Sequence, residues 1–444
     1  MQPEELAKYI KEQLLKKGAD DAVVSLNKQE CSQIKYSNSK VSAIKDWYRM
    51  DIGIFAAHKK RTIAISIKDF SKKAADTIIE KLLKFAENLP PNSEYNGIAK
   101  GPFDYKETKK GFDKDIEEVN KGGNIKLVKQ AIDSALKSGA KKVAGVLETD
   151  ISITYLITSG NIEAKEKSTS LYFSLRALID KYASCHLNYG ARTLDNFQPD
   201  KIGKAAAETA RKALNPVEGR SGKFDVLFSP LAFANILANI GEASSIFSVE
   251  SGLSCLAGKL NKMIASPLVN LYDDGTAPNA LGSSKFDAEG VPSKKNALIK
   301  NGELKTYLHN TSTAKRHGTE TTANAGLISP EPNNIILENG KSSEEEMLKE
   351  IKEGYYITNL WYTRFNNYNT GDFSTIPRDA VFYVKDGEIK YSVKNMRISD
   401  NILTILKNIK MIGNKPEHIF GWEVEVPVTT PMVLVKSINI SKPE

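Results

Sequence analysis

Residues 5–26, ELAKYIKEQLLKKGADDAVVSL, and residues 124–147, NIKLVKQAIDSALKSGAKKVAGVL, follow one pattern. Each begins as an amphipathic helix with apolar residues three and four positions apart, then reaches a Gly-Ala pair and continues as an apolar run. The two Gly-Ala pairs, which begin at Gly18 and Gly139, are separated by 121 positions. The sequence therefore predicts an internal duplication.

The segments around these stretches extend the duplication. Each predicted helix is followed by runs in which apolar and polar residues alternate, typical of antiparallel hairpins, and then by a second helix at 71–89 or 199–215. The repeat units cover about 1–90 and 121–215. Between them, residues 90–115 are rich in Pro, Gly and charge and predict a surface connection. We expect an N-terminal domain over residues 1–215.

After residue 215 the pattern changes. A short apolar strand precedes a helix that starts near Leu231 and is expected to carry residues 241–246. Most of the remaining chain is short β runs, and the dipeptides Asn301-Gly302 and Asp386-Gly387 between alternating residues predict tight hairpins. The fold class is thus α+β with two domains, the second a β-rich barrel or sandwich over 222–444.

Composition narrows the class of protein. The 444 residues are 41% hydrophobic and 26% charged, which is typical of a globular protein. No apolar run is long enough for a membrane span or signal peptide, so we expect a cytoplasmic protein without membrane contact. The net charge of +8 is scattered, which disfavours a nucleic-acid surface. The three cysteines form no CxxC pair, and no phosphate-binding glycine motif or GxSxG elbow occurs.

Four stretches resemble a known family. They are SGKFDVLFSPLAFANIL (221–237), SCLAGKLNKMIASPLVNLYDDGT (254–276), GSSKFDAEGVPSKKNALIKNGELKTYLHNTSTAKRHG (282–318) and TRFNNYNTGDFS (363–374). Their order and spacing are similar to those of the TldD/TldE family, which includes the gyrase modulator PmbA. The N-terminal half is also similar, through its GAD and AAAETARKAL segments, so the resemblance covers nearly the whole chain.

The resemblance also indicates which member this is. In TldD, an HExxxH motif before the AGKL segment and a C-terminal cysteine hold zinc. Here the two histidine positions are Gly241 and Ile246, Glu242 remains at the carboxylate position, and no cysteine follows Cys255. Zinc needs nitrogen, sulfur or oxygen ligands, so the family's metal site is lost. The chain resembles TldE, the subunit without zinc.

This resemblance implies a set of partners. No cofactor is expected in this chain, and zinc is expected in a TldD-like subunit. The substrates would be unfolded peptides, bound extended in an enclosed chamber. The isolated chain would expose an apolar surface and self-associate as a homodimer. Two alternatives remain: a regulator or binding protein acting like a DNA gyrase modulator, and a stand-alone hydrolase with a rearranged site on Glu242, Asp287 and Glu289.

The polar segment 363–374 supplies the candidate substrate-binding residues. Its amide, hydroxyl and carboxylate groups suit either contacts to a peptide main chain or a turn that binds its own backbone. Arg364 and the nearby Arg378 suit pairing with a substrate carboxylate or a partner acid, and a role as ordinary surface residues is the alternative. The candidates are Arg364, Asn366, Thr370, Gly371 and Asp372.

The remaining candidates have alternatives too. Asp287 and Glu289 would share one side of an extended segment and could act as acid and base, or they could lie in a turn between two elements. Glu242 could be a remnant general base or a structural contact. His317 is expected to cap the helix 311–318 rather than bind metal. Cys185 and His186 are adjacent on a predicted strand and should point to opposite faces.

Overall fold

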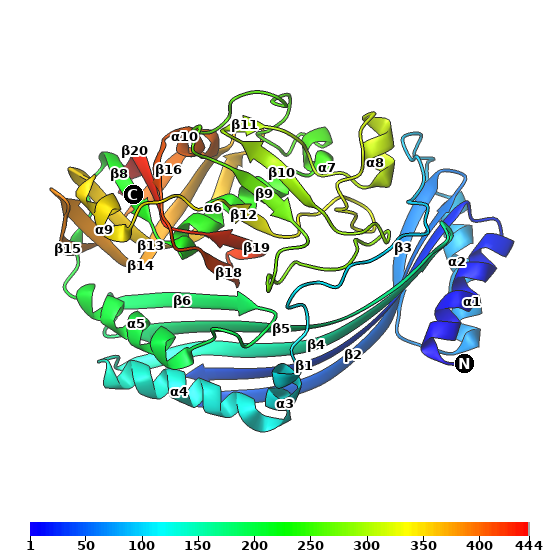
Figure 1. The fold of residues 1–444 in the computed structure, drawn as a ribbon, viewed down its shortest axis with the longest axis horizontal. Coiled ribbons are helices and arrows are strands. Elements are labelled where there is room, and N and C mark those ends of the chain that lie inside the picture. Colours follow the sequence, from blue (N-terminus) through cyan, green and yellow to red (C-terminus); the bar gives the residue numbers. More distant parts are fainter. Residues whose placement is uncertain (443–444) are drawn as a thin grey trace.

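The computed structural model describes residues 1–442 (Figure 1). The first half of the chain forms one antiparallel sheet with the strand order β3-β2-β1-β4-β5-β6. Its elements are α1 (Pro3–Lys16), β1 (Asp21–Ser37), β2 (Lys40–His58), β3 (Arg61–Ile67), α2 (Lys72–Glu87), α3 (Lys114–Glu118), the π-helical turn η1 (Val119–Gly123), α4 (Asn124–Lys137), β4 (Lys142–Thr158), β5 (Ile162–Leu178), β6 (Ser184–Ala191) and α5 (Pro199–Lys212).

The predicted duplication is confirmed. Each unit consists of a helix, three antiparallel strands and a second helix, and the two units join at the pairing of β1 with β4. The helices of each unit bury their apolar faces on their own half of the sheet. Ile10 of α1 and Ile79 of α2 belong to one buried cluster with Ile54, and Val128 of α4 belongs to another with Phe173. Four helices therefore cover one face of a strongly curved sheet (Figure 1).

The second half of the chain is rich in strands, as predicted. Its elements are β7 (Val217–Glu218), β8 (Gly222–Phe228), α6 (Pro230–Ala243), α7 (Ile246–Glu250), β9 (Leu271–Asp274), β10 (Lys295–Lys300), β11 (Glu303–Leu304), α8 (Thr311–Arg316), β12 (Ile335–Leu337), α9 (Glu344–Lys349), β13 (Glu353–Asn367), β14 (Asp372–Lys385), β15 (Glu388–Lys394), β16 (Arg397–Asn401), α10 (Ile402–Lys407), β17 (Ile409–Ile412), β18 (Glu417–Gly421), β19 (Val424–Thr430) and β20 (Val433–Ser441).

These strands form two sheets. One has the order β11-β10-β9-β12-β19-β18. In the other, β13, β8, β20, β16 and β14 follow one another and β14 pairs with β13 again, so the sheet closes into a barrel. Both predicted hairpins are present: φ is positive at Asn301 and Gly302 between β10 and β11, and at Asp386 and Gly387 between β14 and β15. Both pairs suit the type I′ turn that their sequences favour.

The helix expected over residues 241–246 is interrupted, so that prediction was wrong. α6 ends at Ala243 and α7 begins at Ile246. The Ser244 hydroxyl donates to the carbonyl of Ile240 at 2.7 Å, and the Ser245 hydroxyl donates to the carbonyl of Pro330 at 2.7 Å. Serine hydroxyls compete with the helical hydrogen bonds of the backbone, which explains the break.

The two halves meet on the open face of the curved sheet (Figure 1). β18 lies against β6, and the rings of Tyr172 and Phe420 form an edge contact with centroids 5.7 Å apart. Arg176 of β5 pairs with Asp379 of β14, with Nε 3.0 Å from Oδ1. Within residues 1–442, no helix combines the length and apolar character needed to cross a membrane.

Candidate functional site

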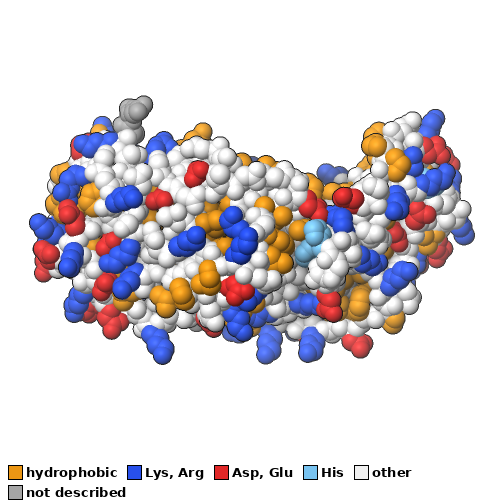
Figure 2. Space-filling view, turned by 90° about the horizontal axis from the view of Figure 1, so that it is seen from above, with side chains coloured by type: hydrophobic (Ala, Val, Ile, Leu, Met, Phe, Trp, Pro, Cys, Tyr) orange, Lys and Arg blue, Asp and Glu red, His pale blue; other side chains and the backbone are white. Residues whose placement is uncertain are grey.

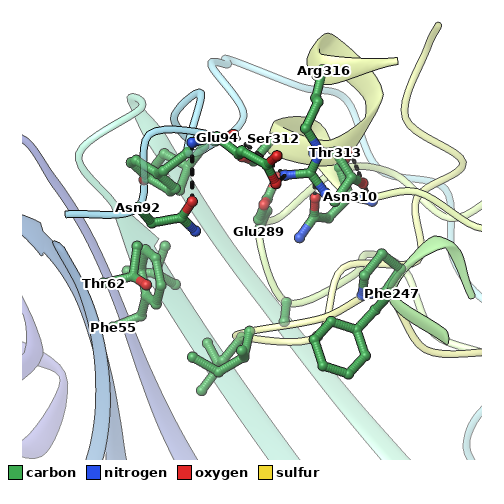
Figure 3. A pocket seen from close by; sticks show the side chains of 18 of the residues that line it. Phe55, Thr62, Asn92, Glu94, Phe247, Glu289, Asn310, Ser312, Thr313 and Arg316 are labelled. Carbon is green, nitrogen blue, oxygen red and sulfur yellow. Dashed lines mark hydrogen bonds and ion pairs between the residues drawn. The ribbon is translucent and has the colours of Figure 1, made fainter. Parts of the chain in front are cut away.

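A pocket of 220 Å³ lies beside the break between α6 and α7 (Figure 3). Its walls come from distant parts of the chain: Phe55 of β2, residues 92–98 of the connection after α2, Phe247 of α7, and residues 310–313 at the start of α8. Phe55 and Phe247 face it from opposite sides. The volume is smaller than the roughly 300 Å³ of small-molecule sites, so it suits one or two side chains rather than a cofactor.

Glu289 is the buried acid of this pocket. Its side chain is 7% exposed and accepts the backbone N–H of Thr311 at 3.3 Å. Burial, and then the negative charge of Asp287, raise the pKa of Glu289 to about 7. A carboxyl group in such a site can hold or release a proton near neutral pH. It also joins the start of α8 to the connection near Ala99, whose backbone N–H it accepts.

Asp287 has a structural role instead. Its carboxylate accepts the backbone N–H groups of Glu289, Val291 and Ala325 at 2.9 to 3.0 Å. The extended segment expected here is therefore a tight turn, and the alternative of a turn between two elements is correct. Because its oxygens are occupied by backbone donors and the residue is 8% exposed, Asp287 holds the turn that carries Glu289.

Ion pairs close the rim of the pocket. The guanidinium of Arg316 pairs with Glu250 of α7, with Nε 3.0 Å from Oε1, and His317 Nε2 lies 2.7 Å from the same oxygen. His317 is the C-cap of α8, as predicted, and it also ties α8 to α7. His309 is buried beside it, and burial, followed by the charge of His317, lowers the pKa of His309 to about 4. His309 is therefore neutral at physiological pH.

The three positions at which the family resemblance places a zinc motif, Gly241, Glu242 and Ile246, do not line this pocket. Gly241 faces β12: a Cβ at this position would lie 2.6 Å from Cγ1 and 2.8 Å from Cδ1 of Ile335. Ile246 is 1% exposed in the apolar core. The residue Glu242 retains exposed surface near the end of α6, but desolvation of its carboxyl group, followed by the charge of Glu425, raises the pKa of this group.

The segment 363–374 forms the end of the hairpin between β13 and β14. Asp372 accepts from the Thr370 hydroxyl at 2.5 Å and from the Asn401 amide at 2.9 Å, and Gly371, with a φ of +82°, completes the turn. The side chain of Arg364 donates to the carbonyl of Thr363 and lies over the ring of Tyr362. These contacts match the turn alternative.

The hairpin end still lies near the break. A Cβ on Gly371 would be 3.1 Å from Cβ of Cys255, just after α7. Asn366 and Asp372 line a separate polar pocket of 410 Å³ beside α10. The Ser254 hydroxyl in turn donates to the carbonyl of Ala243 at 2.6 Å, so the hairpin end lies near the end of α6. The hairpin end and the Glu289 pocket have no lining residue in common.

Cys185 packs in the core while His186 lies on the other face of β6, as predicted. The sequence did not predict that the His186 ring contacts the Ser174 hydroxyl at 2.8 Å. Arg378 lies over the ring of Trp361. No sequence motif identifies Phe55, Phe247, Glu250 or Arg316 as pocket residues, because only folding brings their segments together.

Comparisons with known proteins agree with this architecture. Residues 221–442 match the PmbA/TldA metallopeptidase C-terminal domain, and residues 110–214 match the central domain. A metalloprotease of Methanocaldococcus jannaschii is 29% identical over 438 residues, which cover 93% of each chain. Such matches define the class of protein as metallopeptidase-like.

Solved structures extend the similarity to the whole fold. A Thermotoga maritima protein, named as a proposed modulator of a DNA gyrase, superimposes with a TM-score of 0.87 at 25% identity over 99% of this chain and 100% of that one. TldE from Thermococcus kodakarensis has the same fold, with a TM-score of 0.86 at 21% identity over 98% of this chain and 100% of that one. The chain belongs to the PmbA/TldD family.

Proposed function

We propose that this chain is the non-catalytic, zinc-free subunit of a TldD/TldE-type metallopeptidase that degrades unfolded peptides. A TldD-like subunit would supply the zinc, and this chain would form part of the chamber that receives the peptide. The proposal extends the metalloprotease names of the relatives to a heteromeric complex.

The packing around Gly241 is the main support. A catalytic zinc site needs three ligands with nitrogen, sulfur or oxygen atoms and an open position. Glycine and isoleucine offer none, and Ile335 fills the space that a side chain at Gly241 would need. No HExxxH sequence occurs in the 444 residues. The residues at these positions do not fit a zinc ion.

A partner surface is also available. Five large apolar side chains between residues 247 and 268 are 42 to 52% exposed. Phe247 belongs to α7 and the other four follow this helix in the chain. Figure 2 shows apolar side chains among charged ones on the face of the molecule seen from above. Exposed apolar patches of this kind mark protein interfaces. We define these residues as the apolar face: Phe247, Leu253, Leu260, Met263 and Leu268.

The test uses the purified chain and an HExxxH-bearing member of the same family from the same genome. We expect the chain alone to carry no stoichiometric zinc by elemental analysis and to leave an unfolded labelled peptide uncut. The mixture should form a stable complex by size-exclusion chromatography and cleave the peptide. The control replaces the glutamate of the partner's HExxxH with glutamine and should abolish cleavage without disturbing the complex. Cleavage by this chain alone, with bound zinc, would overturn the proposal.

A further inference from the structure

A second cavity, of 1110 Å³, lies on the other side of the segment that borders the Glu289 pocket. One wall is residues 99–109 of the connection after α2, and the other comes from residues 274–295. Ile98 lines the Glu289 pocket while Ala99 lines this cavity, so the two spaces are neighbours separated by one segment. We call it the lysine cleft, because six lysines line it: Lys100, Lys106, Lys109, Lys285, Lys294 and Lys295.

The walls of the lysine cleft are tied together. The Tyr105 hydroxyl donates to the carbonyl of Gly290 at 2.7 Å, and its ring meets that of Phe286 with centroids 5.4 Å apart. Lys285 of one wall pairs with Glu107 of the other at 2.6 Å. Because these contacts fix the connection against the second half of the chain, the cleft is largely formed before a ligand enters, which reduces the entropic cost of binding.

The charge of the cleft is only partly compensated. Three carboxylates line it beside the six lysines: that of Glu107 is paired with Lys285, and that of Asp274 accepts from Thr276. Three lysines of one wall are exposed: Lys100, Lys106 and Lys109. Within residues 1–442, no carboxylate lies within ion-pair distance of their ammonium groups. A groove lined by unpaired charges of one sign raises the local concentration of an oppositely charged ligand.

Other lining residues distinguish between classes of anion. Phe103, Val291 and Pro292 give the cleft apolar surface. Phe103 is the one aromatic residue among those that line the cleft, which therefore lacks the row of aromatic side chains on which nucleic-acid bases stack. An extended peptide that carries carboxylates among small apolar side chains matches both the charge and the apolar surface.

We propose that the lysine cleft binds an extended acidic peptide segment. The proposal goes beyond the function proposed above, because the cleft is complete in this chain and needs neither zinc nor a partner. Lysine ammonium groups would pair with the peptide carboxylates, and the apolar surface would contact the intervening side chains. Such binding should weaken with salt, since the exposed charges are screened.

The experiment measures fluorescence anisotropy with the full chain. The probes are a fluorescein-labelled twelve-residue peptide alternating Glu with Ala, the same peptide with Lys for Glu, and a twelve-nucleotide oligothymidylate. One variant combines Lys100→Glu, Lys106→Glu and Lys109→Glu. The matched control carries the same change of charge on the outer side of α4. It combines Lys126→Glu, Lys129→Glu and Lys137→Glu, all exposed.

We expect the acidic peptide to bind and the Lys peptide not to bind. The cleft variant should weaken binding at least about tenfold, as expected when clustered charges are reversed, while the α4 variant should change it little. Equal loss in both variants, no loss in the cleft variant, or tighter binding of the oligothymidylate would overturn the proposal. None of these results depends on peptide cleavage, so the outcome is separate from that of the proposed function.

Discussion

The closed position at Gly241 makes a prediction about stability that can be worked out from the packing. Alanine has the higher helix propensity, so Gly241→Ala would by itself stabilise α6 by about 1 kcal/mol. The new Cβ, however, would lie 2.6 Å from Cγ1 of Ile335, whose side chain is fully buried. Overpacking of this kind costs about 1 to 3 kcal/mol. We expect the clash to exceed the gain, with a net loss of about 1 kcal/mol.

Ile335→Ala supplies the matched background. The single change removes the atoms that meet the Cβ and should itself cost about 2 to 5 kcal/mol, because it leaves a cavity. In that background, Gly241→Ala fills part of the cavity and keeps its helix propensity, so it should stabilise by about 1 kcal/mol. The sign of the Gly241→Ala effect should therefore reverse, with a coupling of about 2 kcal/mol between the two positions.

Thermal unfolding of the four proteins, followed by calorimetry, measures this cycle. The comparison uses the transition that shifts in Ile335→Ala, because a chain with several sheets need not unfold in one step. A Gly241→Ala change that raises Tm in both backgrounds, or lowers it equally in both, would refute the claim that Ile335 closes the position. In the proposed function, that closure is why a single histidine could not restore a metal ligand.

Three further predictions follow from other groups. Folding raises the pKa of Glu289 from 4.5 to about 7, so the folded state holds this proton more tightly than the unfolded state does. The free energy of unfolding should therefore fall by about 3 kcal/mol as pH rises from 4.5 to 7. In measurements of Tm against pH, Glu289→Gln should flatten that fall, and an unchanged slope would contradict the prediction. Despite burial, Arg176 and then His186 hold the pKa of Asp379 below its ordinary value, so the stability that this carboxylate contributes is present at neutral pH and lost on acidification. Asp379→Asn should cost about 3 to 5 kcal/mol at neutral pH, measured as the shift in denaturant midpoint relative to Asp133→Asn at an exposed position of α4. Combining Leu253→Glu with Leu268→Glu on the apolar face should reduce self-association of the isolated chain in analytical ultracentrifugation, whereas dimers of undiminished stability would exclude this face as the contact.

Local patterns predicted much of the fold. The repeated helix and Gly-Ala pair identified the duplicated unit, because helix periodicity and chain reversal are encoded within a few residues. The Asn301-Gly302 and Asp386-Gly387 turns formed as expected, since both need positive φ at two successive residues. The choice between barrel and sandwich could not be made, because it depends on the pairing of β14 with β13 after the sheet has curved round.

The candidate site was harder to predict. The break at Ser244 and Ser245 depends on the carbonyl of Pro330, which lies 85 residues beyond Ser245, so helix propensity alone favoured one continuous helix. The pair between Arg176 and Asp379 joins residues 203 positions apart. Asp287 and Glu289 were identified as a pair, but their different roles follow from contacts that the sequence does not show: backbone N–H groups surround one carboxylate, and the other faces a pocket.

The distribution of acids near the break explains why a stand-alone hydrolase is the weaker alternative. Such an enzyme would need Glu242, Asp287 and Glu289 to converge on one reacting atom. Asp287 is occupied by three backbone donors, Glu289 faces the pocket, and Glu242 lies near the end of α6, outside the lining of that pocket. The three carboxylates therefore have separate surroundings. The proposed subunit, with the chemistry supplied by a partner, needs no such convergence, and in that proposal the exposed apolar face would be where the partner binds.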